Sequence, residues 1–123
     1  MADDVIELSV KNMRAIKRTM RETIEKMDQK GAEGLVARAT LDLHAFMTKI
    51  THYDSGRLRN SLFPEINGST GRIFTNVVYA PYEEARGGKH AFMSRTESEG
   101  TPIVRKALGE YGSLIQGTGE QTA

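Results

Sequence analysis

The hydrophobic residues in the first half of the chain recur every three or four positions, a spacing that predicts two amphipathic helices. The first helix is expected from Asn12, whose side chain can cap it. Its hydrophobic face comprises Met13, Ile16, Met20, Ile24 and Met27. Gly31 and Gly34 predict a break between residues 29 and 34, after which a second helix extends to about Ile50. The wide hydrophobic face of this second helix comprises Leu35, Val36, Ala39, Leu43, Phe46, Met47 and Ile50.

The middle of the chain predicts a β-hairpin. Residues 62–66 and 72–79 have strand-like composition and are joined by a glycine-containing loop at 67–71. Pro64 lacks a backbone donor, so the first of these strands is expected at a sheet edge. Residues 5–10 alternate in part and are rich in β-branched side chains, which leaves two alternatives: an edge strand, or the first turn of the first helix.

Shorter helical segments are expected around the hairpin and at the end of the chain. Asp54 or Ser55 can cap a short helix over residues 56–62, and residues 80–86 can close with a helical turn. Thr101-Pro102 predicts the start of a last helix, since proline suits the first helical position. The hydrophobic face of that helix comprises Ile103, Val104, Ala107, Leu108, Tyr111, Leu114 and Ile115.

Residues 87–101 show no period and predict a long loop, polar apart from Phe92 and Met93. Two alternatives remain for this pair: an exposed anchor that enters a neighbouring subunit, or a contact with the protein's own core. Residues 1–115 are expected to form a single α+β domain, with two long N-terminal helices and a C-terminal helix packed on a small antiparallel sheet. Residues 116–123 have the composition of a flexible tail.

Composition restricts the function classes without selecting one. The chain has 123 residues and a formal net charge of +1. This near-balance argues against a dedicated nucleic-acid binder, which usually has a clear excess of basic residues. It contains no cysteine, which excludes disulfides, zinc ribbons and thiol catalysis. No apolar run approaches the roughly 18 residues of a membrane span. The acidic N-terminus does not resemble a signal peptide, so we expect synthesis and retention in the cytosol until assembly.

One local cluster of positive charge stands out against this balance. Four basic residues lie opposite the hydrophobic face of the first helix, at helical spacing: Lys11, Arg14, Arg18 and Arg21. They can form a solvated face that pairs with Glu22 and Glu25. They can also form a stripe that contacts DNA phosphates or an acidic partner.

The sequence offers no convincing catalytic or metal-binding constellation. His90, Ser94 and Glu97 are close in sequence but occur in a segment with no predicted scaffold. Glu83 and Glu84 are adjacent, and adjacent residues on a helix do not face each other. His44 and His52 have no second ligand at metal-binding spacing. We therefore expect neither an enzyme nor a cofactor or metal site.

Three short elements, in this order, resemble a known pattern. They are residues 54–62 (DSGRLRNSL), 79–84 (YAPYEE) and 102–108 (PIVRKAL). Together they resemble the neck and tail-completion proteins of siphophages, which include minor tail components and head–tail joining proteins. The resemblance covers roughly residues 35–115. It departs at residues 51–53, where Thr-His-Tyr stands in place of the usual proline, and at residues 85–87, where Ala-Arg-Gly replaces an aromatic-glycine-threonine run.

The resemblance implies an α+β virion protein that forms a homo-oligomeric ring at the head–tail junction and helps to join or terminate the tail. The ring would be sixfold by analogy with the tail, or twelvefold near the portal. Its neighbours would be head-closure or connector, tail-terminator or tail-tube proteins, with DNA passing through the lumen. The protein would reside in the virion neck or tail, and in the host cytoplasm during assembly. A small nucleic-acid-binding regulator that uses the basic face of the first helix is the alternative.

Charge and exposure suggest which residues would form the subunit interface. Arg57 and Arg59 could pair with Glu83 and Glu84, either within one subunit or across the ring seam. A head-to-tail ring needs two different patches on each subunit. The hairpin edge and the 87–101 segment, with Phe92 and Met93, are the candidates for one patch. The first helix is the candidate for the other.

Overall fold

The computed structural model describes residues 6–51 and 56–122, and the side chains of these as far as residue 111. The described chain is α+β, as predicted: helices pack on a small antiparallel sheet of order β1-β3-β2. The strands are β1 (Ile6–Ser9), β2 (Phe63–Asn67) and β3 (Thr70–Thr75). The helices are α1 (Lys17–Glu25), α2 (Gln29–Ile50), α3 (Arg57–Ser61), α4 (Ala80–Ala85), α5 (Phe92–Glu99) and α6 (Thr101–Thr122), with short 3₁₀ segments η2 (Val10–Asn12) and η3 (Gly88–His90).

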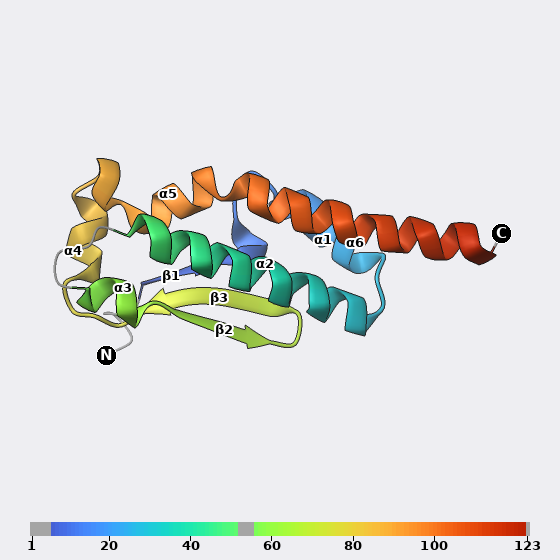
Figure 1. Ribbon diagram of the computed structural model, residues 1–123, viewed down its shortest axis with the longest axis horizontal. Helices are drawn as coiled ribbons and strands as arrows, with labels where there is room; N and C mark the ends of the chain where they lie inside the picture. Colours follow the sequence, from blue (N-terminus) through green and yellow to red (C-terminus); the bar gives the residue numbers. More distant parts are fainter. Residues whose placement is uncertain (1–5, 52–55, 123) are drawn as a thin grey trace.

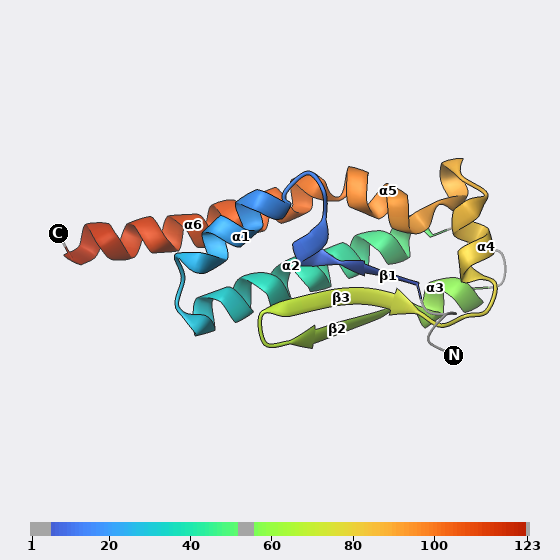
Figure 2. The ribbon, with the colours of Figure 1, turned by 180° about the vertical axis from the view of Figure 1, so that it is seen from behind.

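Helix α2 is the centre of the fold. It lies between the sheet on one side and α5 with α6 on the other, as Figures 1 and 2 show. Its close approach to the sheet depends on Gly71 in β3, because a Cβ there would overlap Thr40 Oγ1 and lie 3.0 Å from Val36 Cγ1. On the other side, α6 is joined to α2 by a hydrogen-bonded ion pair of 2.8 Å between Arg38 Nη1 and Glu110 Oε2.

The hydrophobic core follows this arrangement. Residues from α1, α2, β3, α5 and α6 meet around α2, and the largest fully buried side chains are Phe92, Met13, Ile16, Met20, Leu35, Leu43, Met47 and Ile73. The predicted hydrophobic faces of the long helices are therefore confirmed at their central positions. Phe46 and Ile50 at the end of α2 are only half-buried.

The N-terminal third differs from the prediction in its boundaries. Residues 6–9 form the edge strand β1, which resolves the two alternatives left open for this segment. Helix α1 begins at Lys17 rather than Asn12, because Val10, Met13 and Ile16 reach the core from η2 and from turns. The predicted break also lies earlier than residue 29: Asp28 caps α2 by accepting a hydrogen bond of 2.7 Å from Gly31 N, which places Gly31 inside the helix.

The second half keeps most predicted elements but differs from the prediction in three places. The hairpin forms with Pro64 on an edge strand, and helices α3 and α4 are confirmed, whereas the second strand ends at Thr75 rather than Tyr79. Residues 87–101 are mostly helical, containing η3 and α5, so the prediction of a long loop is wrong. Helix α6 continues through the segment 116–122, where a tail was expected. The proposed caps Asp54 and Ser55 lie outside the described residues.

No helix within the described residues is both long enough and apolar enough to span a membrane.

Candidate interaction surfaces

Residues of the first two sequence elements build one end of the molecule, where α3 meets α4 (Figure 1). Gly56 precedes α3 with φ of 79°, a left-handed conformation that glycine adopts without strain. The Arg57 guanidinium lies 5.8 Å from the centre of the Tyr79 ring, a cation–π distance. Ser61 Oγ lies 2.6 Å from Thr75 Oγ1, joining α3 to the end of β3. These contacts give residues 56–61 and Tyr79 an architectural role.

Arg59, Glu83 and Glu84 each contact another group within the subunit, and the pairing of Arg57 and Arg59 with the two glutamates across a ring seam stays a prediction. Arg59 donates from Nη2 to the Thr51 carbonyl at 2.9 Å, at the C-terminal end of α2. Glu83 accepts from His90 Nδ1 at 2.7 Å and from Arg86 Nη1 at 3.2 Å. Burial opposes ionisation of Glu83, but hydrogen bonding and electrostatic attraction to His90 and Arg86 outweigh it and hold the pKa of Glu83 below its ordinary value.

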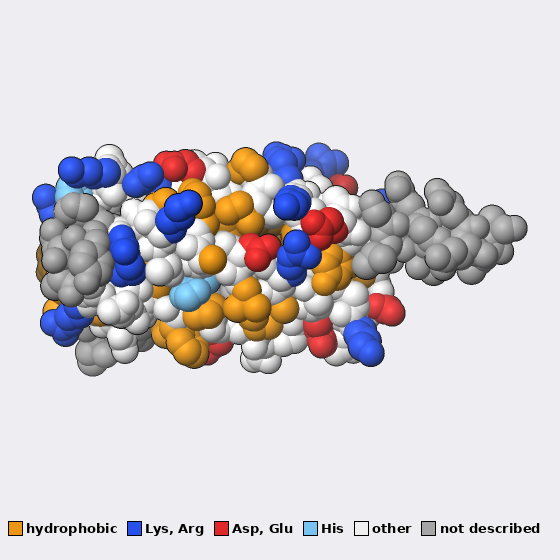
Figure 3. All heavy atoms as spheres, viewed as in Figure 1, with side chains coloured by type: hydrophobic (Ala, Val, Ile, Leu, Met, Phe, Trp, Pro, Cys, Tyr) orange, Lys and Arg blue, Asp and Glu red, His pale blue; other side chains and the backbone are white. Residues whose placement is uncertain are grey.

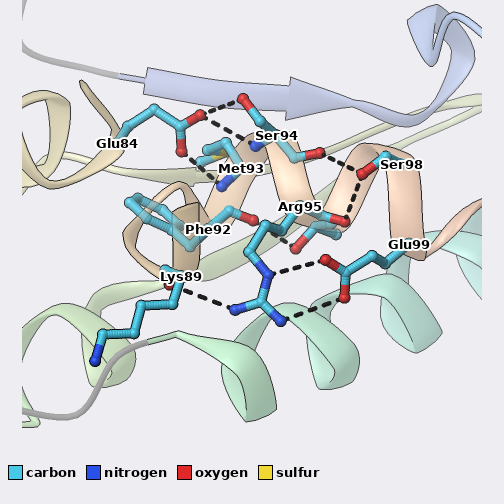
Figure 4. A network of polar contacts seen from close by, with 9 residues as sticks. Glu84, Lys89, Phe92, Met93, Ser94, Arg95, Ser98 and Glu99 are labelled. Carbon is cyan, nitrogen blue, oxygen red and sulfur yellow. Dashed lines mark hydrogen bonds and ion pairs between the residues drawn. The ribbon is translucent and has the colours of Figure 1, made fainter. Parts of the chain in front are cut away.

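Glu84 caps helix α5 from a different helix (Figure 4). Its carboxylate accepts hydrogen bonds from Met93 N at 2.8 Å, from Ser94 N at 3.1 Å, and from Ser94 Oγ. A carboxylate at this end of a helix satisfies backbone donors that lack partners and interacts favourably with the helix dipole. Glu84 thereby fixes where α5 begins.

We expect Glu84→Ala to lower the free energy of unfolding by about 1–2 kcal/mol, the usual cost of losing a helix cap. The matched control is Glu99→Ala, which removes the exposed Arg95–Glu99 ion pair of 2.9 Å at the other end of α5. The control should change stability less, because it leaves no backbone donor without a partner. Urea denaturation followed by circular dichroism measures both variants. Equal losses would show that Glu84 acts as an ordinary surface charge.

Phe92 and Met93 are core residues. Phe92 is fully buried and Met93 nearly so, both within the main hydrophobic cluster. The interpretation of this pair as an exposed anchor for a neighbouring subunit is therefore wrong. The segment folds onto α2 and α4 because α5 turns Phe92, Met93 and Thr96 toward them.

The residues considered for catalysis are directed to separate structural partners. His90 contacts Glu83, Ser94 contacts Glu84, and a Glu97 oxygen accepts from Arg14 N at 2.8 Å. His44 Nε2 lies 2.9 Å from the Leu62 carbonyl, and His52 is outside the described residues. In residues 6–51 and 56–111, no group of three or more His, Asp or Glu side chains is placed to hold a metal ion.

Hydrophobic side chains that sequence reasoning did not single out are exposed near the α3–α4 end. Tyr82 in α4 is 73% exposed, Val78 in the segment before it is 62% exposed, and Phe63 at the start of β2 is 54% exposed. Phe63 packs edge-on against Phe74, with ring centres 5.4 Å apart. We call Phe63, Val78 and Tyr82 the apolar patch. No sequence signal indicated their exposure, because Phe63 and Val78 have hydrophobic neighbours in the chain.

The outer face of the sheet, away from α2, carries a row of charges beside the apolar patch. The register pairs Arg72 on β3 with Glu65 on β2 and with Ser9 on β1, and Glu7 lies two residues before Ser9, opposite Phe74. Arg72 bridges the two carboxylates, at 2.8 Å from Glu7 and 2.7 Å from Glu65. Hydrophobic and charged side chains are also mixed on the face that Figure 3 shows. Leu41 of α2 is a further exposed hydrophobic residue.

The predicted basic stripe is on the surface, although helix α1 carries only part of it. Arg14 lies in the turn before α1, Arg18 and Arg21 lie on α1, and all three are exposed, whereas Lys11 in η2 is half-buried. Arg18 pairs with Glu22 at 3.0 Å, as the solvated-face interpretation expected. A shallow surface hollow is lined by Arg14, Lys17, Arg18, Arg21 and Glu22.

Comparisons with protein-family models, with curated proteins and with solved structures found no match for this chain.

Proposed function

We propose that this protein is a structural subunit of a long-tailed bacteriophage that assembles with copies of itself into a ring at the head–tail junction. The three sequence elements that resemble neck and tail-completion proteins support the proposal. Two of them meet at the α3–α4 end through Arg57 and Tyr79, and the third begins α6, where Val104, Ala107 and Leu108 are buried. The elements thus contribute to folding and shape, as expected for residues that define a structural component.

The observation that carries the proposal is the apolar patch. Large hydrophobic side chains that are left exposed mark candidate interface positions, and tyrosine is enriched at the energetically important positions of interfaces. Tyr82 belongs to α4, Val78 lies just before α4, and Phe63 begins β2 just after α3, so these residues replace Phe92 and Met93 as the candidate interface. In a head-to-tail ring it would contact a different surface of the next copy.

The ring would contact head-closure or connector proteins on one side and tail-terminator or tail-tube proteins on the other. The sixfold symmetry of the tail and the twelvefold symmetry near the portal are both compatible with a subunit of this size. A protein with this role would be found in the virion neck or tail after assembly in the host cytoplasm. No chemistry is assigned to it.

The test is a stop codon in this gene in the phage that carries it, followed by electron microscopy of the lysate. We expect DNA-filled heads beside separate tails, and infectious particles again when the wild-type protein is supplied in trans. Infectious particles of normal shape without the protein would overturn the proposal.

The same complementation assay tests the apolar patch. Val78→Ser combined with Tyr82→Ser should fold normally, because both side chains are exposed, yet fail to restore infectious particles. The control is Leu41→Ser, which removes a 50% exposed side chain from α2, outside the patch, and should complement fully. Purified protein examined by sedimentation should show the same difference in oligomer formation. Full complementation by the double variant would remove the patch from the proposed interface.

A further inference from the structure

Five cations from two parts of the chain gather on one side of the molecule, around α1 and the start of α6. They are Arg14, Lys17, Arg18, Arg21 and Arg105, and all are exposed. Arg105 belongs to α6, and its Nη2 lies 3.5 Å from the Ala15 carbonyl, so its guanidinium group is beside Arg14. The two views of the ribbon agree that α1 runs along α6 (Figures 1 and 2). We call these five residues the basic face.

The positive charges of the basic face destabilise helix α1. On α1, Arg21 lies four positions after Lys17 and three after Arg18, spacings at which like charges on a helix repel. Lys17 and Arg18 occupy the first turn of α1, where the helix dipole disfavours positive charge, and this turn contains no acidic residue. Among the described residues, Arg18 is the one member that forms an ion pair, with Glu22. Met20, buried on the opposite side, holds α1 in place despite these costs.

The chemistry of this surface favours a nucleic-acid backbone over a protein partner. The hollow in the basic face is lined only by charged side chains: four cations and Glu22. Protein–protein interfaces have an apolar centre, whereas protein–DNA interfaces are strongly positive and wet. Exposed hydrophobic side chains large enough to serve as such a centre lie instead at the apolar patch and at Leu41 and Ile66. The hollow also lacks aromatic rings that could stack on bases, so phosphate contact without sequence preference is the mode that fits.

We infer that the basic face binds the phosphate backbone of duplex DNA without base specificity. One subunit suffices for the contact, so the inference does not depend on ring assembly. A net charge of +1 over the whole chain predicts weak binding by a single copy, since the rest of the surface adds little attraction. Several copies that face the same duplex would bind far more tightly through their combined contacts.

The test is fluorescence anisotropy of a labelled random-sequence duplex, titrated with the purified protein between about 50 and 200 mM salt. Four to five phosphate contacts predict a slope of log K against log salt of about −4. Arg14→Gln combined with Arg21→Gln should weaken binding at least about tenfold at the lowest salt and make the slope shallower by about 2. The matched control is Lys49→Gln combined with Lys89→Gln, which removes the same charge from exposed positions at the α4 end of the molecule. The control should bind like the wild type.

Equal weakening by both double variants would show that overall charge, and not the basic face, attracts DNA, and would overturn the inference. It would also be overturned if poly-glutamate binds the wild type while the duplex does not, because the partner would then be an acidic protein surface. Circular dichroism should show that both variants are folded. None of these readouts requires a ring. Failure to bind DNA would therefore leave the proposed virion role standing, and failure of the virion role would leave DNA binding by the basic face standing.

Discussion

Phe92→Ala is expected to lower the free energy of unfolding by about 3–5 kcal/mol, as for other large side chains removed from a core. Phe92 is fully buried in the cluster that joins α5 to α2, and its loss leaves a cavity that the surrounding helices can fill only in part. For a chain of 123 residues this is a large fraction of the total stability. Urea denaturation followed by circular dichroism measures the change.

Tyr82→Ala is the control for this variant, since it also removes an aromatic ring but from a side chain that is 73% exposed. Its effect on unfolding should stay within about 0.5 kcal/mol, as for most surface substitutions. The two variants separate folding from assembly: Phe92→Ala should lose stability, and Tyr82→Ala should lose oligomers. A stable Phe92→Ala variant that fails only in assembly would restore Phe92 as an anchor for a neighbouring subunit.

The elements that could be predicted from sequence are those whose signal is local. The central hydrophobic positions of α2 recur at helical spacing because one stripe of that helix faces the core. Pro64 predicted a sheet edge because it cannot donate within a ladder, and β2 is at the edge. Thr101-Pro102 predicted the start of α6 for the equally local reason that proline fits the first helical turn.

Helix α5 could not be predicted because its determinants are distant in sequence. The residue at its N-cap, Ala91, has no side chain that can cap, and the role falls to Glu84 on α4. Its buried residues Phe92, Met93 and Thr96 cover too few turns to show a period. Before α1, by contrast, a helix was predicted where none forms: Met13 and Ile16 have helical spacing but reach the core from segments that precede the helix.

For the candidate surfaces too, local signals could be recognised in the sequence, whereas contacts between distant segments could not. Arg14, Arg18 and Arg21 were identified by their spacing, but Arg105 joins them only because α6 folds back beside α1. The pairing of Arg57 and Arg59 with the two glutamates was inferred from charge alone. In the structure Glu84 is engaged by the backbone of α5, whose donors at Met93 and Ser94 compete for its oxygens. Charge in the sequence could not indicate this competition.

Gly100→Ala is expected to destabilise the protein by about 1–3 kcal/mol or more, the range for adding a methyl group to a tightly packed site. Gly100 separates α5 from α6, and a Cβ there would fall on the Thr96 carbonyl oxygen and lie 2.6 Å from Leu43 Cδ2. The carbonyl cannot move aside easily, because it accepts a hydrogen bond of 2.8 Å from Gly100 N. The clash would therefore push α5 and α6 away from α2. Urea denaturation measures the loss.

Gly109→Ala is the matched control, because Gly109 lies on α6 and a Cβ added there would enter open space. That substitution should stabilise the helix by about 0.5–1 kcal/mol, since alanine restricts the unfolded chain more than glycine does. The same chemical change thus has opposite expected signs at two positions only nine residues apart. Stabilisation at both positions would contradict the close packing of Gly100 against Leu43 and the Thr96 carbonyl.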